Sequence, residues 1–252
     1  MGYRQYYVAV FALCTLPIIN NPGLAEDNEQ KLTLLVKEAG GSVVTSRRGP
    51  DKRIFFSVLL MSTKTNDALL KTVSNYPDID SLVVDSSIIT DDGIREIKRI
   101  SNLRNLFLAC RQVTDAGLAH VAECPAITGI YISGPLITDS GIQELKKVKG
   151  LKELGLDRTA ITDSALKQIC DFQSLESLSI GECKVTIAGI KQLATLKHLV
   201  LLNLCHTNAD DDCLNSFATL ETLSEINLKG TAVTDKGCER FQKTHPECRI
   251  LR

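Results

Sequence analysis

One six-residue pattern recurs through most of this chain at a spacing of 24 residues. Its first complete copy, Ile89–Ile94, reads Ile-Thr-Asp-Asp-Gly-Ile, and the polar residue in its second place recurs at positions 90, 114, 138, 162, 186, 210 and 234 without an insertion or deletion. A fixed period of this length is typical of stacked repeats. Because each such unit contacts only its neighbours, the spacing predicts an extended solenoid and not one compact core.

Each repeat predicts a short strand followed by a capped helix. In Leu151–Leu156 the leucines near the end alternate with outward residues, which indicates a strand. Thr162 then stands where a helix N-cap is expected, because its hydroxyl can accept a hydrogen bond from the first turn. Asp163 adds negative charge at the positive end of the helix dipole. Since Ile161 and Leu166 occupy the two places of a hydrophobic staple, we interpret the pattern as a device for starting a helix.

The repeats depart from this plan at a few positions. The fifth copy has Ile187 in place of the aspartate, and the sixth has Asp210 in place of the capping threonine. Aspartate is a good N-cap, so the sixth helix should still form. Around Arg111 and Pro135 the turn after the strand departs from the usual Thr or Cys pattern, and we expect those loops to differ locally.

The consensus Leu-x-x-Leu-x-Leu-x-x-(Thr/Cys)-x-(Ile/Val)-Thr-Asp resembles the leucine-rich repeat. Cys124 and Cys183 fall on the two cysteine positions of its cysteine-containing subtype, and the match covers about residues 55–252. The resemblance implies an α/β horseshoe solenoid with a parallel sheet on the concave side and helices on the convex side. The chain also resembles the secreted leucine-rich repeat proteins of bacteria. The subtype is best known from F-box receptors of ubiquitin ligases, but no F-box segment stands in this sequence.

Residues 26–54 are expected to cap the N-terminal end of the repeat array. Residues 27–39 predict a helix ended by Gly40-Gly41, and residues 42–45 and 53–60 predict two strands joined by the polar turn 46–52. The second strand already keeps the 24-residue register, and Asn66–Leu70 is a degraded copy of the repeated pattern. An exposed end of a stack needs such a cap to hide its apolar face.

Residues 1–25 have the layout of a secretory signal peptide. A short polar start with Arg4 precedes the 12-residue apolar run Val8–Ile19, and Gly23 and Ala25 supply small residues before a cut ahead of Glu26. The run is too short to span a membrane. We therefore expect cleavage after Ala25 and a secreted or periplasmic protein.

The charge balance argues against a nucleic-acid or membrane partner. Formal net charge is -1, and residues 26–252 carry 28 basic and 30 acidic side chains, a net of -2. A surface that binds nucleic acid needs a strong basic excess to neutralise phosphates. An anionic membrane would attract a polybasic segment, and the sequence has none.

The sequence predicts no catalytic, metal or cofactor site. Cys213 and Cys238, in adjacent helix starts, are the one pair of the eight mature cysteines that suggests a disulfide. Asp210–Asp212 with His206 could suggest a metal site, but an acidic helix start explains these residues better. We find no Ser/His/Asp arrangement, phosphate loop or carboxylate pair, and we expect no catalysis.

The residues between the inward leucines remain as candidates for function. A solenoid leaves its concave sheet face open, and extended binding surfaces form there. Phe107 and Tyr131 should be neighbours on this face and form an aromatic patch, the kind of feature that anchors a protein partner. The predicted concave binding residues are Phe107, Tyr131, Asp85, Asp157, Asn203, Asn227 and Lys229.

These observations favour a monomeric, non-catalytic protein-binding module that is secreted or periplasmic. One alternative is a structural component of a cell-envelope assembly, which would use its edges and convex helices. Another is an F-box-like adaptor of the ubiquitin-ligase type, if residues 1–25 are not a signal peptide.

Overall fold

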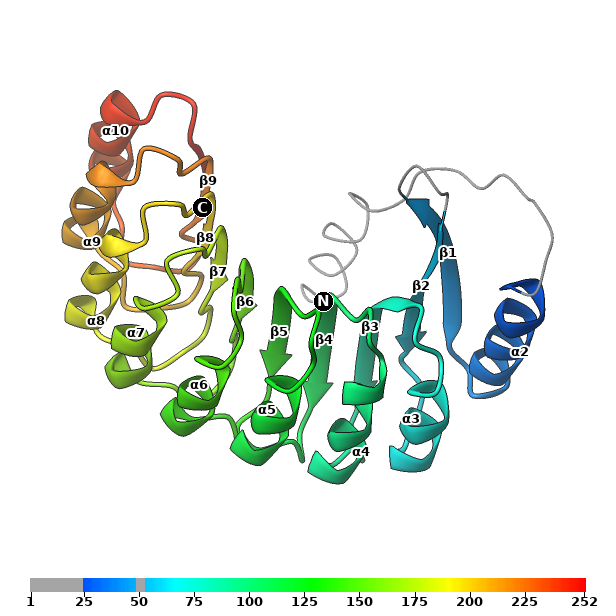
Figure 1. Cartoon of the computed structure of the whole chain (residues 1–252). Helices are drawn as coiled ribbons and strands as arrows, with labels where there is room; N and C mark the ends of the chain where they lie inside the picture. The colour runs from blue at the N-terminus through cyan, green and yellow to red at the C-terminus, as the bar shows by residue number, and fades with distance from the viewer. Residues whose placement is uncertain (1–24, 49–52) are drawn as a thin grey trace.

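A computed structural model describes residues 25–48 and 53–252 as a curved stack of strands backed by helices (Figure 1). The ten strands of the described residues form one sheet in the order of the sequence. β1 pairs with β2 in antiparallel fashion, and every later pair is parallel. The strands are β1 (Ser42–Arg48), β2 (Arg53–Leu60), β3 (Ile79–Ser86), β4 (Asn105–Cys110), β5 (Gly129–Ser133), β6 (Glu153–Gly155), β7 (Ser177–Ser179), β8 (Leu201–Asn203), β9 (Glu225–Asn227) and β10 (Arg249–Leu251).

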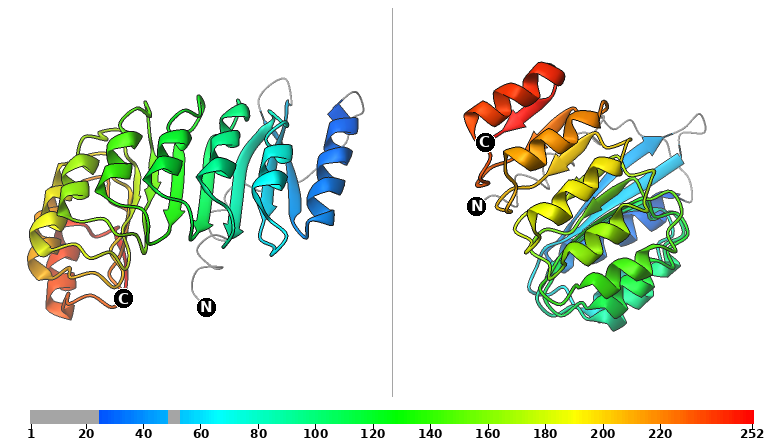
Figure 2. Two further views of the ribbon diagram at one scale, coloured as in Figure 1. Left: turned by 90° about the horizontal axis from the view of Figure 1, so that it is seen from below. Right: turned by 90° about the vertical axis from the view of Figure 1, so that its left-hand side faces the viewer.

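The helices form a second layer on the convex side of the arc, as the two further views confirm (Figure 2). From α3 onward, each helix lies in the connection between two parallel strands, which is the arrangement that a parallel pair requires. The α-helices are α2 (Ala25–Glu38), α3 (Asp67–Val73), α4 (Asp91–Glu96), α5 (Asp115–Val121), α6 (Asp139–Leu145), α7 (Asp163–Ile169), α8 (Ile187–Gln192), α9 (Asp211–Ser216) and α10 (Asp235–Thr244). Short 3₁₀ segments follow three of them, at Ile97–Arg99, Leu193–Thr195 and Phe217–Thr219.

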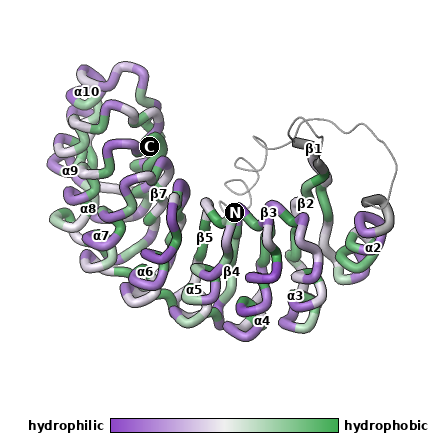
Figure 3. Tube along the Cα trace, in the orientation of Figure 1, coloured by the Kyte–Doolittle hydropathy of each residue, from purple (hydrophilic) through white to green (hydrophobic). Residues whose placement is uncertain are grey.

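The core runs without a break between the two layers. Strand residues in the same repeat position pair across the sheet, as Leu106 does with Ile130 and Ile130 with Leu154. All three are fully buried and belong to one continuous apolar cluster. In Figure 3 hydrophobic stretches recur in every coil between hydrophilic ones, as expected for repeats that bury apolar side chains against their neighbours.

The N-terminal end consists of α2 and the β1–β2 hairpin. Leu32 and Val36 of α2 are fully buried in the continuous core. The helix begins two residues earlier than the sequence predicted, and β1 extends through Arg48, so part of the predicted 46–52 turn is strand. Positions 49–52 of that turn lie outside the described residues.

Two kinds of turn follow the strands, as the sequence around Arg111 and Pro135 predicted. From β6 onward the strands end early, and the residue that begins the turn has a positive φ: 58° at Arg158, 58° at Glu182, 53° at His206 and 70° at Gly230. These four positions are 24 residues apart. The threonine after three of them donates its hydroxyl to the carbonyl three residues back, at 2.7 Å in Thr159, Thr207 and Thr231. The β3–β5 strands are longer because they lack this turn.

Candidate functional site

The six-residue pattern joins neighbouring repeats as well as starting helices. Oγ1 of Thr114 accepts a hydrogen bond from the first turn of α5 and so caps it. The same residue donates from its backbone N–H and its hydroxyl to the Asp91 carboxylate of the preceding helix, at 2.9 and 2.7 Å. Asp91 corresponds to Asp163 in the repeat, for which the sequence predicted a role in the helix dipole alone. We call this pairing the Asp–Thr interlock; it joins Asp67 to Thr90, Asp91 to Thr114, Asp115 to Thr138, Asp139 to Thr162, Asp163 to Thr186 and Asp211 to Thr234.

The glycine of the pattern makes room for this carboxylate. A Cβ added to Gly117 would lie 2.5 Å from Oδ1 of Asp91, far inside contact distance. The interlock is interrupted where Ile187 replaces the aspartate, and in the next repeat the threonine has become Asp210 and the glycine Cys213. All three places of the interlock therefore change together. Asp210 caps α9 by accepting from the N–H of Cys213 at 3.0 Å.

The concave face comprises the side chains of β2 to β10, and of the residues directly after them, that point away from the helices. Phe107 and Tyr131 pair across β4 and β5, as predicted, and their rings stack at 4.7 Å with 4° between the planes. With Val83 they form a small cluster separate from the main core. The predicted openness of this patch is not observed, since Phe107 is 4% exposed and Tyr131 8%. The two rings form a stacked platform and not a free aromatic surface.

Tyr131 connects this platform to the next strand. Its ring lies over Gly155, where an added Cβ would meet Cδ1 at 2.4 Å. Its hydroxyl donates to Glu153 Oε2 at 3.0 Å. Glu153 is not among the predicted site residues, although alternation along β6 places it on the same face as Gly155 and Asp157.

A polar network centred on Asp157 continues the concave face beyond the aromatic platform. Ser179 Oγ lies 2.6 and 2.8 Å from the two Asp157 oxygens, and the Gly181 N–H donates to Oδ1 at 2.5 Å. Asn203 Nδ2 donates to Ser179 Oγ at 2.7 Å and approaches Asp157 Oδ1 at 3.5 Å. Desolvation raises the pKa of Asp157, although its hydrogen bonds act in the opposite direction. The network joins three strands around one carboxylate.

The remaining predicted site residues divide between exposed charges and strand ends. Asp85 and Lys229 are exposed at opposite ends of the concave face. Asn203 and Asn227 each accept the backbone N–H two residues on, both at 3.1 Å, from Cys205 and Lys229. The asparagine carbonyls thus stabilise the turn, a role that the sequence analysis did not anticipate.

The eight cysteines of the described residues are free thiols. Cys213 and Cys238, the predicted candidate disulfide, are both buried and unpaired with each other. Burial raises the pKa of Cys110 and of Cys124 to about 12. Because the thiolate is the reactive form, these groups behave as small apolar side chains.

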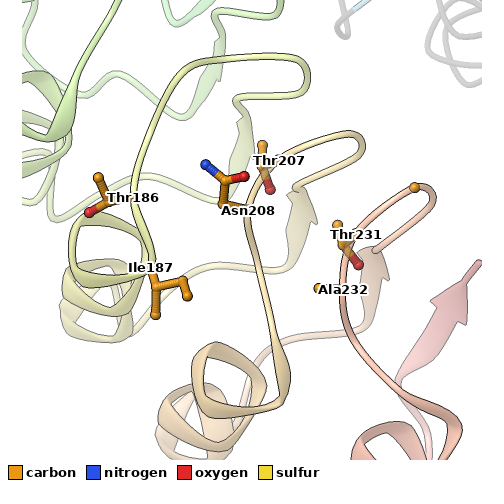
Figure 4. A pocket seen from close by; sticks show the side chains of 7 residues that line it. Thr186, Ile187, Thr207, Asn208, Thr231 and Ala232 are labelled. Atoms are coloured by element: carbon orange, nitrogen blue, oxygen red, sulfur yellow. The ribbon is translucent and has the colours of Figure 1, made fainter.

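One surface hollow lies beside the interrupted interlock, with a volume of about 630 Å³ (Figure 4). Its polar groups already bond the main chain, as Asn208 Nδ2 does to the Val185 carbonyl at 3.1 Å and Thr231 Oγ1 to the Leu228 carbonyl at 2.7 Å. It therefore offers little for orienting a ligand. The lining residues are Thr186, Ile187, Thr207, Asn208, Gly230, Thr231 and Ala232.

Two negative findings hold for residues 25–48 and 53–252. No three His, Cys, Asp or Glu side chains among them are placed to hold a metal ion. Asp210 and Asp211 of the predicted acidic helix start act instead as an N-cap and in the interlock. In the same part of the chain, no helix has both the length and the apolar character needed to cross a bilayer.

The repeat geometry decides the family of folds. Each Leu-x-x-Leu-x-Leu segment forms a strand of one parallel sheet, and each Thr-Asp segment starts a helix on the convex side, in coils of 24 residues. The fold is a leucine-rich repeat solenoid. No protein-family model and no curated protein sequence matches the chain. The cysteine-containing subtype remains a prediction.

Solved leucine-rich repeat structures include distant likenesses to this chain. An internalin from Listeria monocytogenes shares 17% identity at a TM-score of 0.48, over 73% of this chain. A leucine-rich repeat protein from Leptospira interrogans shares 15% identity at a TM-score of 0.41, again over 73% of this chain. The matches cover 56% and 62% of those two chains, respectively. The assignment made above rests on the repeats of this chain itself.

Proposed function

We propose that this protein is a non-catalytic module that binds another protein on its concave face. The observation that carries the proposal is the contrast between the two sides of the sheet. Inward positions repeat the same apolar residue types from coil to coil, whereas the central concave row changes from strand to strand. That row reads Val83, Phe107, Tyr131, Gly155, Ser179, Asn203 and Asn227.

The contacts made by the central concave row also support this proposal. Its residues form the aromatic platform and part of the Asp157 network, neither of which belongs to the main core. A sheet with only an architectural role needs no such succession of aromatic, carboxylate and amide groups on its outer face. Extended concave surfaces are where solenoids bind their partners.

The charged side chains on the convex side form pairs between neighbouring coils, which favours a structural role for them. Lys98 pairs with Glu123 at 2.7 Å and Lys146 with Asp171 at 2.9 Å, each pair joining neighbouring coils. Such pairs stabilise the stack weakly and leave fewer charges for a partner. We therefore rank a cell-envelope assembly that uses the convex helices below concave binding.

Photo-cross-linking in the native cell tests this choice. A photoreactive residue at Ala109, on the concave face, is compared with one at Gln242, exposed on α10. Protein adducts from position 109 and not from 242 support the proposal. Adducts from 242 alone contradict it and favour the assembly role. Phe107→Ala with Tyr131→Ala should then reduce the yield at 109, because the platform is lost.

We also propose that the protein acts outside the cytoplasm. The support is the signal-peptide layout of residues 1–25, and the expected cut falls at the beginning of α2. N-terminal sequencing of the protein from its native cells should find Glu26 first. An intact Met1 would contradict export and return the adaptor alternative to consideration.

A further inference from the structure

The charges on the concave face are of one sign across its central strands. Along β3 to β8 and the residues directly after each strand, side chains that point to the concave face alternate with side chains in the core. Because the strands are in register, the concave side chains form three rows across the sheet. The charged residues in those rows are Asp85, Glu153 and Asp157, with no lysine or arginine. On β9 and β10, Glu225 and Arg249 neutralise each other at 3.2 Å, and Lys229 adds a positive charge at that end. The part of the face from β3 to β8 is therefore acidic although the whole chain is nearly neutral.

Hydrogen bonds hold the Asp157 carboxyl group in a fixed position in this region. Its donors, Ser179, Gly181 and Asn203, are all neutral. The nearest arginine in sequence, Arg158, is paired with Glu182 at 2.7 Å. Within the described part of the chain, Oδ2 accepts a hydrogen bond from Ser179 alone, at 2.8 Å, so this oxygen keeps capacity for another donor. A carboxylate fixed in this way is a prepared acceptor for a cationic group.

Glu153 and Tyr131 extend the same chemistry along the strand. Glu153 and Asp157 lie on one face of the β6 segment, about 13 Å apart along the chain, with Gly155 and the overlying Tyr131 ring between them. Two carboxylates on one face of this segment suit the charged head of a lysine or arginine.

We propose that the concave face binds an extended, basic polypeptide segment, with a lysine or arginine of that segment paired to Asp157 beside the Tyr131 platform. This inference rests on the proposed concave binding and specifies its partner. A polypeptide fits better than a small polyamine because the acidic residues lie on, or directly after, two strands of an open sheet, β3 and β6, with β4 and β5 between them. Small ligands favour enclosed pockets. The surface hollow of Figure 4 lies elsewhere, at the loops before α8 to α10.

Selection from a displayed library of random 12-residue peptides tests this chemistry on the purified protein. The peptides enriched on wild type should carry net positive charge and bind more weakly as salt rises. Asp157→Asn should weaken their binding about tenfold or more, since a charge-assisted bond is lost. Glu221→Gln removes the same charge from an exposed site outside the face and should leave binding unchanged.

The possible outcomes distinguish the proposal of a basic partner from the proposal of concave binding. Neutral or acidic peptides cross-linked to the concave face would overturn the basic partner but keep concave binding. Peptides cross-linked to the convex helices would overturn both. Displacement of selected peptides by equimolar spermidine would identify a polyamine site and overturn the polypeptide. Equal binding to wild type and Asp157→Asn, or a library without binders, contradicts the pairing at Asp157.

Discussion

The carboxylate of Asp115 accepts two hydrogen bonds from Thr138, one from its backbone N–H at 2.8 Å and one from its hydroxyl at 2.6 Å. The two residues are 23 positions apart and begin neighbouring helices. Thr138 in turn caps α6. The helix start of one repeat is therefore completed by the repeat before it, which couples the coils of the solenoid.

Loss of this coupling should destabilise the protein. Asp115→Ala leaves the N–H and hydroxyl of Thr138 without their acceptor, and we expect a loss of about 1–3 kcal/mol in the free energy of unfolding. Urea denaturation measures it. Asp171→Ala, which removes only the exposed pair with Lys146, should cost under about 1 kcal/mol. Equal effects of the two substitutions would show that the interlock adds nothing.

The interruption at Ile187 predicts a strongly non-additive set of substitutions. Ile187→Asp alone places a second carboxylate beside Asp210, so we expect lower stability. Combined with Asp210→Thr and Cys213→Gly, the same change supplies the donor and the space found in the repeats that carry the glycine. The triple variant should therefore be at least as stable as wild type, by thermal unfolding. A triple variant less stable than Ile187→Asp would refute the coordinated role of these three positions.

Two aspartates should affect stability with opposite dependence on pH. Burial raises the pKa of Asp157, so its folded form takes up a proton more readily than the unfolded chain. Its ionised form thus lowers stability above the folded pKa, and protonation relieves this as pH falls. Asp157→Asn should accordingly match or exceed wild type near pH 7, with any advantage shrinking at acid pH.

Asp211 provides the contrast. Its bonds from Thr234, with the nearby Arg240, lower its pKa. It therefore stabilises the fold above the unfolded pKa, and this contribution disappears as pH falls through the folded value. Asp211→Asn should be less stable than wild type near pH 7, with the gap closing at low pH. Unfolding midpoints of both variants and of wild type should be measured from about pH 2.5 to 7. If the stability difference from wild type changed with pH in the same direction for both variants, both assignments would be wrong.

Sequence alone accounts for the elements of the fold but not for how they lock together. The N-cap role of Thr162 follows from local spacing, and the structure confirms it. The bonds of Asp139 to Thr162 could not be read in the same way, because they depend on how closely adjacent coils stack. The glycine of the pattern had no explanation in the sequence for the same reason.

The candidate site was predicted in outline only. Strand alternation correctly placed Phe107 beside Tyr131, but it cannot report how far each ring is buried. Glu153 could have been found by extending the same alternation by two residues. The Asp157 network joins the turn after β6 to β7 and β8, so it becomes visible only when the register of the sheet is known.

The buried cysteines should resist modification in the folded protein. Because burial raises the pKa of Cys110 and Cys124 to about 12, little thiolate is present at pH 8. Iodoacetamide followed by mass spectrometry should label the half-buried Cys170 and Cys205 first, and the other two only after unfolding. Rapid labelling of Cys124 in the native protein would contradict its assignment to the core.

The central claim is that the repeated pattern maintains the fold and the concave face provides function. Its most direct test measures the affinity of one concave-binding peptide, together with unfolding free energy, for Asp115→Ala and Asp157→Asn. We predict that Asp115→Ala loses stability and keeps affinity, whereas Asp157→Asn keeps stability and loses affinity. If Asp157→Asn binds as wild type does while Asp115→Ala, still folded, does not, the account is wrong.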